Sequence, residues 1–215
     1  MIRMPRWSFI ALALLSAPLV LANGSSEAGA AKAVTCQACH GPNGNSVIAL
    51  YPNLAGQNAA YLVKQLKYFK SNQRINSNGV MMGMALTLDD QGMQDVSAYF
   101  STQTPTGGEA DPSYWEAGRK LWRGGDVARG IPACMACHGP SGKGNPAAGY
   151  PALRAQHAEY VVKQLTEYGE GKRYAVSDKG ETEGGTYATI MNTIARRLTP
   201  EDIRNLASYA QGLRE

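Results

Sequence analysis

Cysteine and histidine are scarce in this chain of 215 residues, which contains four cysteines and three histidines. All four cysteines lie in two short segments, 36–40 and 134–138, so none is left for a disulfide or a catalytic thiol elsewhere. A structural zinc site would need paired thiols and histidines at other spacings, and each half has too few histidines for it. The chain also lacks a cluster of Lys and Arg interleaved with aromatic residues, so we expect no nucleic-acid partner.

Long apolar segments are equally rare. The one segment that could be a signal peptide or a membrane anchor lies at the start of the chain. Two arginines precede a mostly apolar run at 7–21 that ends in small residues, which predicts cleavage near Ala22. A retained membrane anchor is the alternative, but the run is short for a span and Pro18 interrupts it. We therefore expect residues 1–22 to be a signal peptide and the mature protein to lie in the periplasm.

What the chain does contain is a pentapeptide that occurs twice. The pattern Cys-x-x-Cys-His at 36–40 returns at 134–138. Two thiols three residues apart can form thioethers with the vinyl groups of one haem, and the adjacent imidazole then becomes the proximal ligand of the iron. We therefore predict two covalently attached haem c groups, held by Cys36, Cys39 and His40 in one half and by Cys134, Cys137 and His138 in the other.

The segments that follow each pentapeptide also repeat. Tyr-Pro-Asn-Leu at 51–54 matches Tyr-Pro-Ala-Leu at 150–153, and the amphipathic stretch 61–66 matches 160–165. Each half ends in a further predicted helix, which begins after the N-cap Asp89 in the first and after Thr199 in the second. No strand pattern competes with helix, so the predicted fold is all-α.

A short segment rich in Pro and Gly separates the two repeats. We predict an N-terminal domain at 23–104, a linker at 105–112 and a C-terminal domain at 113–215. The second half also gains a polar, Gly-rich stretch between Tyr174 and Gly185, whose composition predicts a surface loop.

The sixth ligand of each iron must come from elsewhere in the chain. Methionine is the thioether donor that raises the potential of electron-carrying cytochromes c. In the second half Met191 is the only methionine outside the pentapeptide. In the first half the repeat register favours Met81, which lies opposite Met191, and leaves open Met84, Met82 and, least favoured, Met93.

Other polar residues recur at matched positions. His157 could replace Met191 as a ligand, but its counterpart is Asn58, so we expect a solvated histidine at a helix start. A backbone carbonyl at Pro52 or Pro151 could accept the ring N–H of the proximal histidine and fix its orientation. The matched arginines, Arg74 and Arg173, either meet haem propionates or cap a helix.

With Cys-x-x-Cys-His twice, a Tyr-Pro-x-Leu turn after each, and Met-x-x-(Met/Ile)-Ala-x-x-Leu before each last helix, the chain resembles the dihaem cytochrome c4 family. The resemblance covers nearly all of the mature chain. It implies two tandem class I cytochrome c domains related by a pseudo-twofold axis, with the haem propionate edges near the interface. Gly29 and Gly118 match the small residue that lets the first and last helices cross closely in this fold.

The resemblance also implies partners and a location. It implies a periplasmic carrier, often loosely attached to the membrane, that passes electrons from a cytochrome bc complex to a terminal haem-copper oxidase, and we expect a monomer. None of these partners follows from spacing or composition.

A filled sixth position separates a carrier from an enzyme. We expect one-electron transfer with no chemistry on a substrate, because each half offers one methionine in matched register. A dihaem peroxidase, a thiosulfate dehydrogenase or a haem-based gas sensor needs an open or exchangeable iron site, and no spare cysteine or well-placed histidine marks one. The cytochrome subunit of a larger dehydrogenase stays open, since it uses the same chemistry.

Overall fold

Helices supply the regular structure of the described residues, which are 24–75, 79–177, 180 and 182–214 of this computed structural model. The predicted signal peptide at 1–22 lies outside them. The first half contains α1 (Ser26–Lys32), α2 (Val34–His40), a 3-10 turn (Pro42–Gly44), α3 (Ala59–Lys70), α4 (Val80–Leu86) and α5 (Asp90–Ser101). The second half contains α6 (Trp115–Gly124), α7 (Met135–His138), α8 (Ala158–Gly169), α9 (Gly185–Ala195) and α10 (Pro200–Gly212). Among these residues β pairing is confined to isolated bridges, so the all-α prediction is confirmed.

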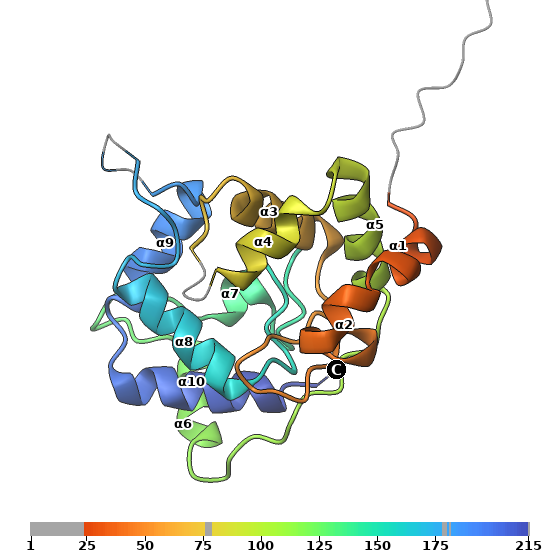
Figure 1. Ribbon diagram of the computed structural model, residues 1–215. Coiled ribbons are helices and arrows are strands. Elements are labelled where there is room, and N and C mark those ends of the chain that lie inside the picture. The colour runs from red at the N-terminus through yellow and green to blue at the C-terminus, as the bar shows by residue number, and fades with distance from the viewer. Residues whose placement is uncertain (1–23, 76–78, 178–179, 181, 215) are drawn as a thin grey trace, which may run out of the picture.

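The two halves repeat one packing scheme. In the first, α5 packs against α1 and α3, and in the second, α10 packs against α6 and α8. Figure 1 shows α1, α2 and α5 on the right of the molecule and α8, α9 and α10 on the left. Each half has its own small apolar core, one around Phe100 and Val96 and the other around Trp122 and Leu206.

The predicted helix starts are present. The Asp89 carboxylate accepts a hydrogen bond from the Gly92 N–H at 2.7 Å and begins α5. The Thr199 hydroxyl and the Asp202 carboxylate form a capping box around Pro200, which begins α10. Residues of α5 and α10 line the cavity described below, so these caps help to fix its walls.

The first and last helices of each half cross at a glycine. A Cβ atom added to Gly29 would lie 2.0 Å from the Asp95 carbonyl oxygen, and one added to Gly118 would lie 2.1 Å from that of Asn205. Such distances are impossible for a real side chain, so only glycine permits this approach of two backbones. The expectation for both glycines is confirmed in geometry.

Gly118→Ala should therefore destabilise the protein strongly. The new methyl group must push α6 away from α10, and overpacking of this kind costs about 1–3 kcal/mol, which corresponds to roughly 2–4 °C of melting temperature per kcal/mol. Thermal unfolding, monitored by circular dichroism, measures the change in melting temperature. Gly124→Ala, in the same helix with no atom within 4 Å of the added Cβ, is the matched control. Equal melting temperatures for the two variants would contradict the close crossing.

Asp95 ties α1 to α5 in the first half alone, since Asn205 occupies its position in the second. Its buried carboxylate accepts hydrogen bonds from the Lys32 ammonium, from the Ser25 N–H at 2.8 Å and from Gln91 at 2.9 Å. The Lys32 ammonium and then the Ser25 N–H lower the pKa of Asp95 to about 2. The carboxylate therefore stays charged far into the acid range.

Asp95→Asn should lower the melting temperature at neutral pH and have little effect near pH 2. A carboxyl group whose pKa is lower in the folded than in the unfolded chain, where it is about 3.9, adds stability above the unfolded value and loses it as the pH falls through the folded value. Melting curves between pH 7 and pH 2 measure the difference. Asp90→Asn, on the exposed side of α5, is the control. A gap between Asp95→Asn and the native protein that stayed constant down to pH 2 would refute this role.

The two halves meet through a reciprocal set of hydrogen bonds. The Gln57 side chain bonds the backbone N–H and carbonyl of Ala152 at 2.9 and 2.8 Å, and Gln156 does the same to Asn53 at 2.8 and 2.9 Å. Gln57 and Gln156 are counterparts in the repeat, as are Asn53 and Ala152. Equivalent residues that contact one another in this way are what a pseudo-twofold axis between the halves requires.

The segment predicted as a linker, 105–112, contains no helix and lies against both halves. Thr106 N–H donates to Asn45 in the first half at 2.9 Å, and Asp111 N–H donates to Ser208 in the second at 2.8 Å. The domain limits themselves, 23–104 and 113–215, remain predictions.

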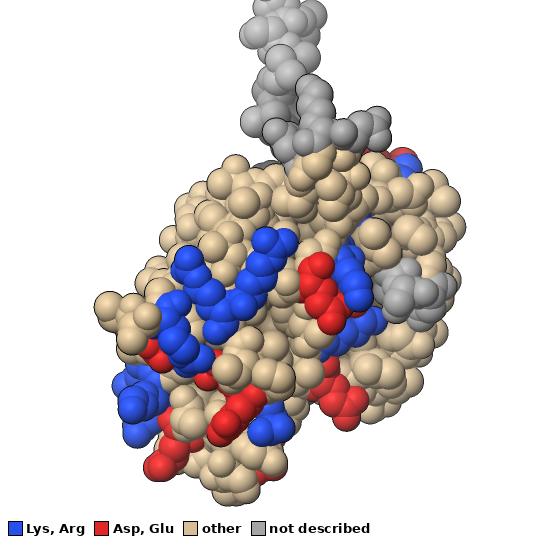
Figure 2. Space-filling view, turned by 90° about the vertical axis from the view of Figure 1, so that its left-hand side faces the viewer, with Lys and Arg blue, Asp and Glu red and all other residues tan. Residues whose placement is uncertain are grey.

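The outer surface of the second half carries charges of both signs. Figure 2, which faces the side with α8, α9 and α10, shows Lys and Arg lying beside Asp and Glu. In the same half, Arg129 donates to Asp126 at 2.6 Å and to both oxygens of Asp202 at 2.6 and 3.2 Å. Within the described ranges, no helix is long and apolar enough to cross a membrane.

Candidate functional site

The two pentapeptide histidines are buried in the same setting. His40 ends α2, His138 ends α7, and each is less than a tenth exposed. The Nδ1 atom of His40 lies 2.9 Å from the Pro52 carbonyl oxygen, and that of His138 lies 2.9 Å from the Pro151 carbonyl oxygen. A carbonyl oxygen can only accept, so Nδ1 carries the proton and Nε2 keeps the free lone pair that a metal needs.

Burial keeps both rings neutral. Desolvation lowers the pKa of His40 and of His138 below the ordinary value, and the proline carbonyls offset only part of this effect. A neutral imidazole with a fixed tautomer is the form that binds iron. The hydrogen bonds expected at Pro52 and Pro151 are present.

The four cysteines line a common cavity with these histidines, and no disulfide joins any two of them. Burial raises the pKa of Cys36, and it raises the pKa of Cys134 to about 11. A catalytic thiol needs the opposite shift, because the thiolate is the nucleophile. Cys36 and Cys134 therefore lack the lowered pKa that a catalytic cysteine needs.

The cavity has a volume of about 640 Å³ and is lined by residues of both halves. Its walls are mostly apolar, with Leu62 and Phe69 from α3, Leu165 from α8 and Leu206 from α10. No group of three or more His, Cys, Asp or Glu side chains in the described part of the chain could hold a metal ion directly. Two thiols, one imidazole and apolar walls in each half fit a covalently attached haem and do not fit a zinc site.

The structure separates the methionine candidates into two groups. Met191 lines the cavity from α9, and both Met81 and Met84 line it from α4. Met82 does not line it, and Met93 is fully buried in the core of the first half. The choice between Met81 and Met84 still depends on the repeat register, in which Met81 falls opposite Met191 and Met84 opposite Ile194.

His157 is placed at a helix start as expected, but it is not fully solvated. It is the N-cap residue of α8 and is half-buried. Its Nε2 donates to the Ser46 carbonyl oxygen of the other half at 2.9 Å, and the residue does not line the cavity. A contact between the halves therefore replaces the water that we expected around this ring.

Several residues at the meeting of the halves were missed by the sequence reasoning. Gln57 and Gln156 join the halves, as described above, and Tyr61 and Tyr160 line the cavity beside the two arginines. Each pair recurs at one register, which is a signal that could have marked them. Tyr174, which begins the stretch predicted as a surface loop, is 5% exposed, so that prediction is wrong for its first residue.

Comparison with known proteins gives the same result for both halves. The family model described as Cytochrome c matches residues 26–104 and again residues 116–214. Cytochrome c4 of Azotobacter vinelandii is 45% identical over 202 residues, which cover 91% of this chain and 92% of that protein. A protein of Thiomonas intermedia described as "Thiosulfate dehydrogenase electron acceptor" is 34% identical over 209 residues, covering 95% of this chain and 90% of that protein. The crystal structure of reduced recombinant cytochrome c4 from Pseudomonas stutzeri superposes with a TM-score of 0.79 at 43% identity and covers 89% of this chain and 100% of that one.

Proposed function

The chain belongs to the dihaem cytochrome c4 family and is an electron-transfer protein with two covalently bound haem c groups in two class I cytochrome c domains, and we propose that each iron is held between a histidine and a methionine. The proposed ligands are His40 and Met81 in the first domain and His138 and Met191 in the second. The proposed thioether bonds are those of Cys36, Cys39, Cys134 and Cys137.

The observation that carries this proposal is the matched geometry of the two halves. Each histidine donates Nδ1–H to a proline carbonyl at 2.9 Å, and in each half a methionine at the same repeat position lines the cavity. The matched methionine gives each half a thioether sulfur that could close its iron site.

The protein side chains then have three tasks. His40 and His138 present Nε2 in a fixed orientation, because the proline carbonyls hold the other ring nitrogen. Met81 and Met191 would each supply a thioether sulfur to the iron of their domain, which would leave no position for water or a small molecule. The apolar walls exclude solvent and keep the ligands in one geometry. When bound, each haem c supplies an iron that gains or loses one electron.

We further propose that the mature chain is a monomer in the periplasm, loosely associated with the membrane, and that it carries electrons from a cytochrome bc complex to a terminal haem-copper oxidase. The signal-peptide pattern at 1–22 supports export, because c-type haem is attached outside the bacterial cytoplasm. The relatives named cytochrome c4 support a carrier that meets other redox proteins.

A second candidate donor follows from the relative described as a thiosulfate dehydrogenase electron acceptor. In that role the chain would accept electrons from a dehydrogenase and leave the chemistry on the substrate to its partner. The carrier mechanism is the same, and only the donor differs.

Oxygen uptake by washed bacterial membranes distinguishes these donors. With the purified protein added back, quinol as the electron source should restore oxygen uptake through the bc complex and the oxidase. Thiosulfate with its dehydrogenase is the comparison, and faster reduction of the haems by that route than by quinol would favour the second donor. Turnover of peroxide or thiosulfate by the protein alone would contradict the carrier assignment.

A further inference from the structure

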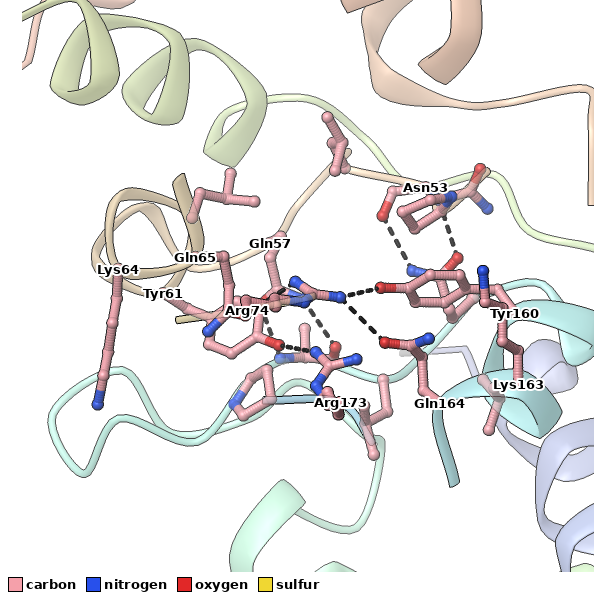
Figure 3. A pocket seen from close by; sticks show the side chains of 18 of the residues that line it. Asn53, Gln57, Tyr61, Lys64, Gln65, Arg74, Tyr160, Lys163, Gln164 and Arg173 are labelled. Atoms are coloured by element: carbon pink, nitrogen blue, oxygen red, sulfur yellow. Dashed lines mark hydrogen bonds between the residues drawn. The ribbon is translucent and has the colours of Figure 1, made fainter. Parts of the chain in front are cut away.

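The wall of the cavity at the junction of the halves is built from matched residues. Figure 3 shows Arg74, which donates to Tyr160 of the second half at 2.9 Å, and Arg173, which donates to Tyr61 of the first half at 3.1 Å. The two arginines are counterparts in the repeat and are 8% and 3% exposed. On this side the two halves therefore offer similar surroundings to a bound group.

The wall beside the proximal histidines differs between the halves. Trp122, the fourth residue after the crossing glycine Gly118, is 2% exposed and lines the cavity. The centroid of its ring lies 6.4 Å from that of the His138 ring, at an interplanar angle of 40°. The fourth residue after Gly29 is Ala33, which is fully buried and does not line the cavity. The indole thus has no equivalent at this position of the first half.

The two histidines consequently differ in their aromatic contacts. His138 contacts Trp122 and also Tyr150, whose ring centroid lies 6.2 Å away. Among the described residues, His40 has one such contact, with Tyr51 at 6.4 Å. The tyrosines are counterparts in the repeat, so the tryptophan is the added ring of the second half.

The first half has an aromatic residue of its own in the cavity wall, but this residue serves another side of the site. Phe100 lines the cavity from α5, at the position where α10 has Ala210. In the described part of the chain its ring contacts Tyr99, at 5.1 Å, and no histidine. Phe100 therefore does not replace the indole beside a proximal ligand.

Trp122 is held in place by the packing of α6 on α10. Its ring lies 5.9 Å from that of Tyr209, and Leu121 and Leu206 belong to the same apolar cluster. This cluster also contacts Cys134 of the pentapeptide. The indole is thus a fixed part of the wall, close to both the thiol and the imidazole of the second site.

An apolar ring beside the proximal ligand affects the redox equilibrium of the iron. Ferric iron carries one more positive charge than ferrous iron, and water stabilises the more highly charged state. The apolar shell around a metal site limits the access of water and so helps to set its reduction potential. A buried tryptophan covers about 150–250 Å², far more than an alanine, so its presence should favour the ferrous state.

We propose that Trp122 is a positioning residue that keeps the His138 imidazole shielded and in one orientation, and thereby raises the reduction potential of the second haem. The proposal rests on the function proposed above, in which His138 is an iron ligand. Both proximal histidines have the same hydrogen bond to a proline carbonyl, at 2.9 Å. The indole therefore makes two otherwise matched sites unequal.

Redox titration of the matured dihaem protein tests the proposal. Trp122→Ala, which introduces the residue of the first half, should lower the reduced-to-oxidised ratio of one haem about tenfold at fixed ambient potential, which is about 59 mV for a one-electron couple. The other haem should keep its native potential. The haem that moves should be the one whose spectrum changes in Met191→Ala.

Two further variants separate the role of the ring from general effects on α6. Trp122→Phe keeps a ring beside His138 and loses no hydrogen bond, because the buried Nε1–H has no partner. It should retain most of the native potential. Trp115→Ala removes the other tryptophan of α6, which is half-buried and does not line the cavity. It should leave both potentials native.

Native potentials in Trp122→Ala, with a native optical spectrum, would overturn the proposal. A similar shift in Trp115→Ala, or a shift of both haems in Trp122→Ala, would also overturn it, since either result indicates a general loosening of the fold. If Trp122→Ala fails to mature, Trp122→Leu takes its place, because leucine fills part of the space without a ring. A lowered potential of the second haem in that variant would support the proposal, and a native one would overturn it.

Failure of this inference can be told from failure of the proposed function. If the proposed ligation is wrong, the unmodified protein itself lacks a methionine-to-ferric-iron band at one or both haems. If only the role of Trp122 is wrong, that band is intact in every Trp122 variant and the potential of the second haem does not move.

Discussion

Met191→Ala should open the iron of the second domain and lower its reduction potential on the order of 0.2 V, a fraction of the roughly 0.8 V range that axial ligands set. The thioether favours ferrous iron, so its loss stabilises the ferric state. In the structure Met191 lies on α9 at the wall of the cavity, where no other methionine of the second half outside the pentapeptide is available. Redox titration and carbon monoxide binding measure the two effects.

The first domain allows a sharper comparison because two methionines line its wall. Met81→Ala should open the iron of the first domain, whereas Met84→Ala should leave its ligation and spectrum native. Met82→Ala, which changes a methionine of the same helix that does not line the cavity, is the control. A native spectrum in Met81→Ala together with an open iron in Met84→Ala would show that the repeat register selects the wrong sulfur.

Cys134→Ser combined with Cys137→Ser should leave a protein with one covalent haem and a largely unfolded second domain. These thiols line an apolar cavity that, without a covalently attached group, has no side chains to fill it. Small domains of about a hundred residues have little core to spare, and the bound haem supplies the missing part. Haem stain after denaturing electrophoresis and far-ultraviolet circular dichroism measure the two losses.

The matched double variant, Cys36→Ser with Cys39→Ser, should unfold the first domain in the same way. The interface glutamines and the buried arginines join the halves, so we expect each double variant also to lower the melting temperature of the intact half. Full helical content in either double variant would contradict the role of haem as part of the core.

The residues that sequence reasoning placed well are those whose role depends on nearby positions in the chain. The pentapeptides, the proline carbonyls a dozen residues later and the caps at Asp89 and Thr199 are all local relations with a fixed spacing. Gly29 and Gly118 followed from the family resemblance, and their geometry is clear in the structure.

The residues that could not be placed are those whose role depends on the other half. The sequence alone does not say which faces of the two repeats meet, so the bond from Arg74 to Tyr160 and that from Arg173 to Tyr61 were unforeseen. His157 was expected in solvent for the same reason, because Ser46 is far away in the chain. Composition also gave no indication that Tyr174 is buried, because this residue lies at the edge of a polar, Gly-rich stretch.

The most direct test of the carrier assignment is ligand binding to the unmodified, fully matured protein. If methionine is the sixth ligand of both irons, the ferric protein should show the methionine-to-iron absorption band with an intensity that accounts for two haems. The ferrous protein should bind no carbon monoxide at either haem. Uptake of carbon monoxide by one haem of the native protein, or a band that accounts for only one haem, would contradict the account.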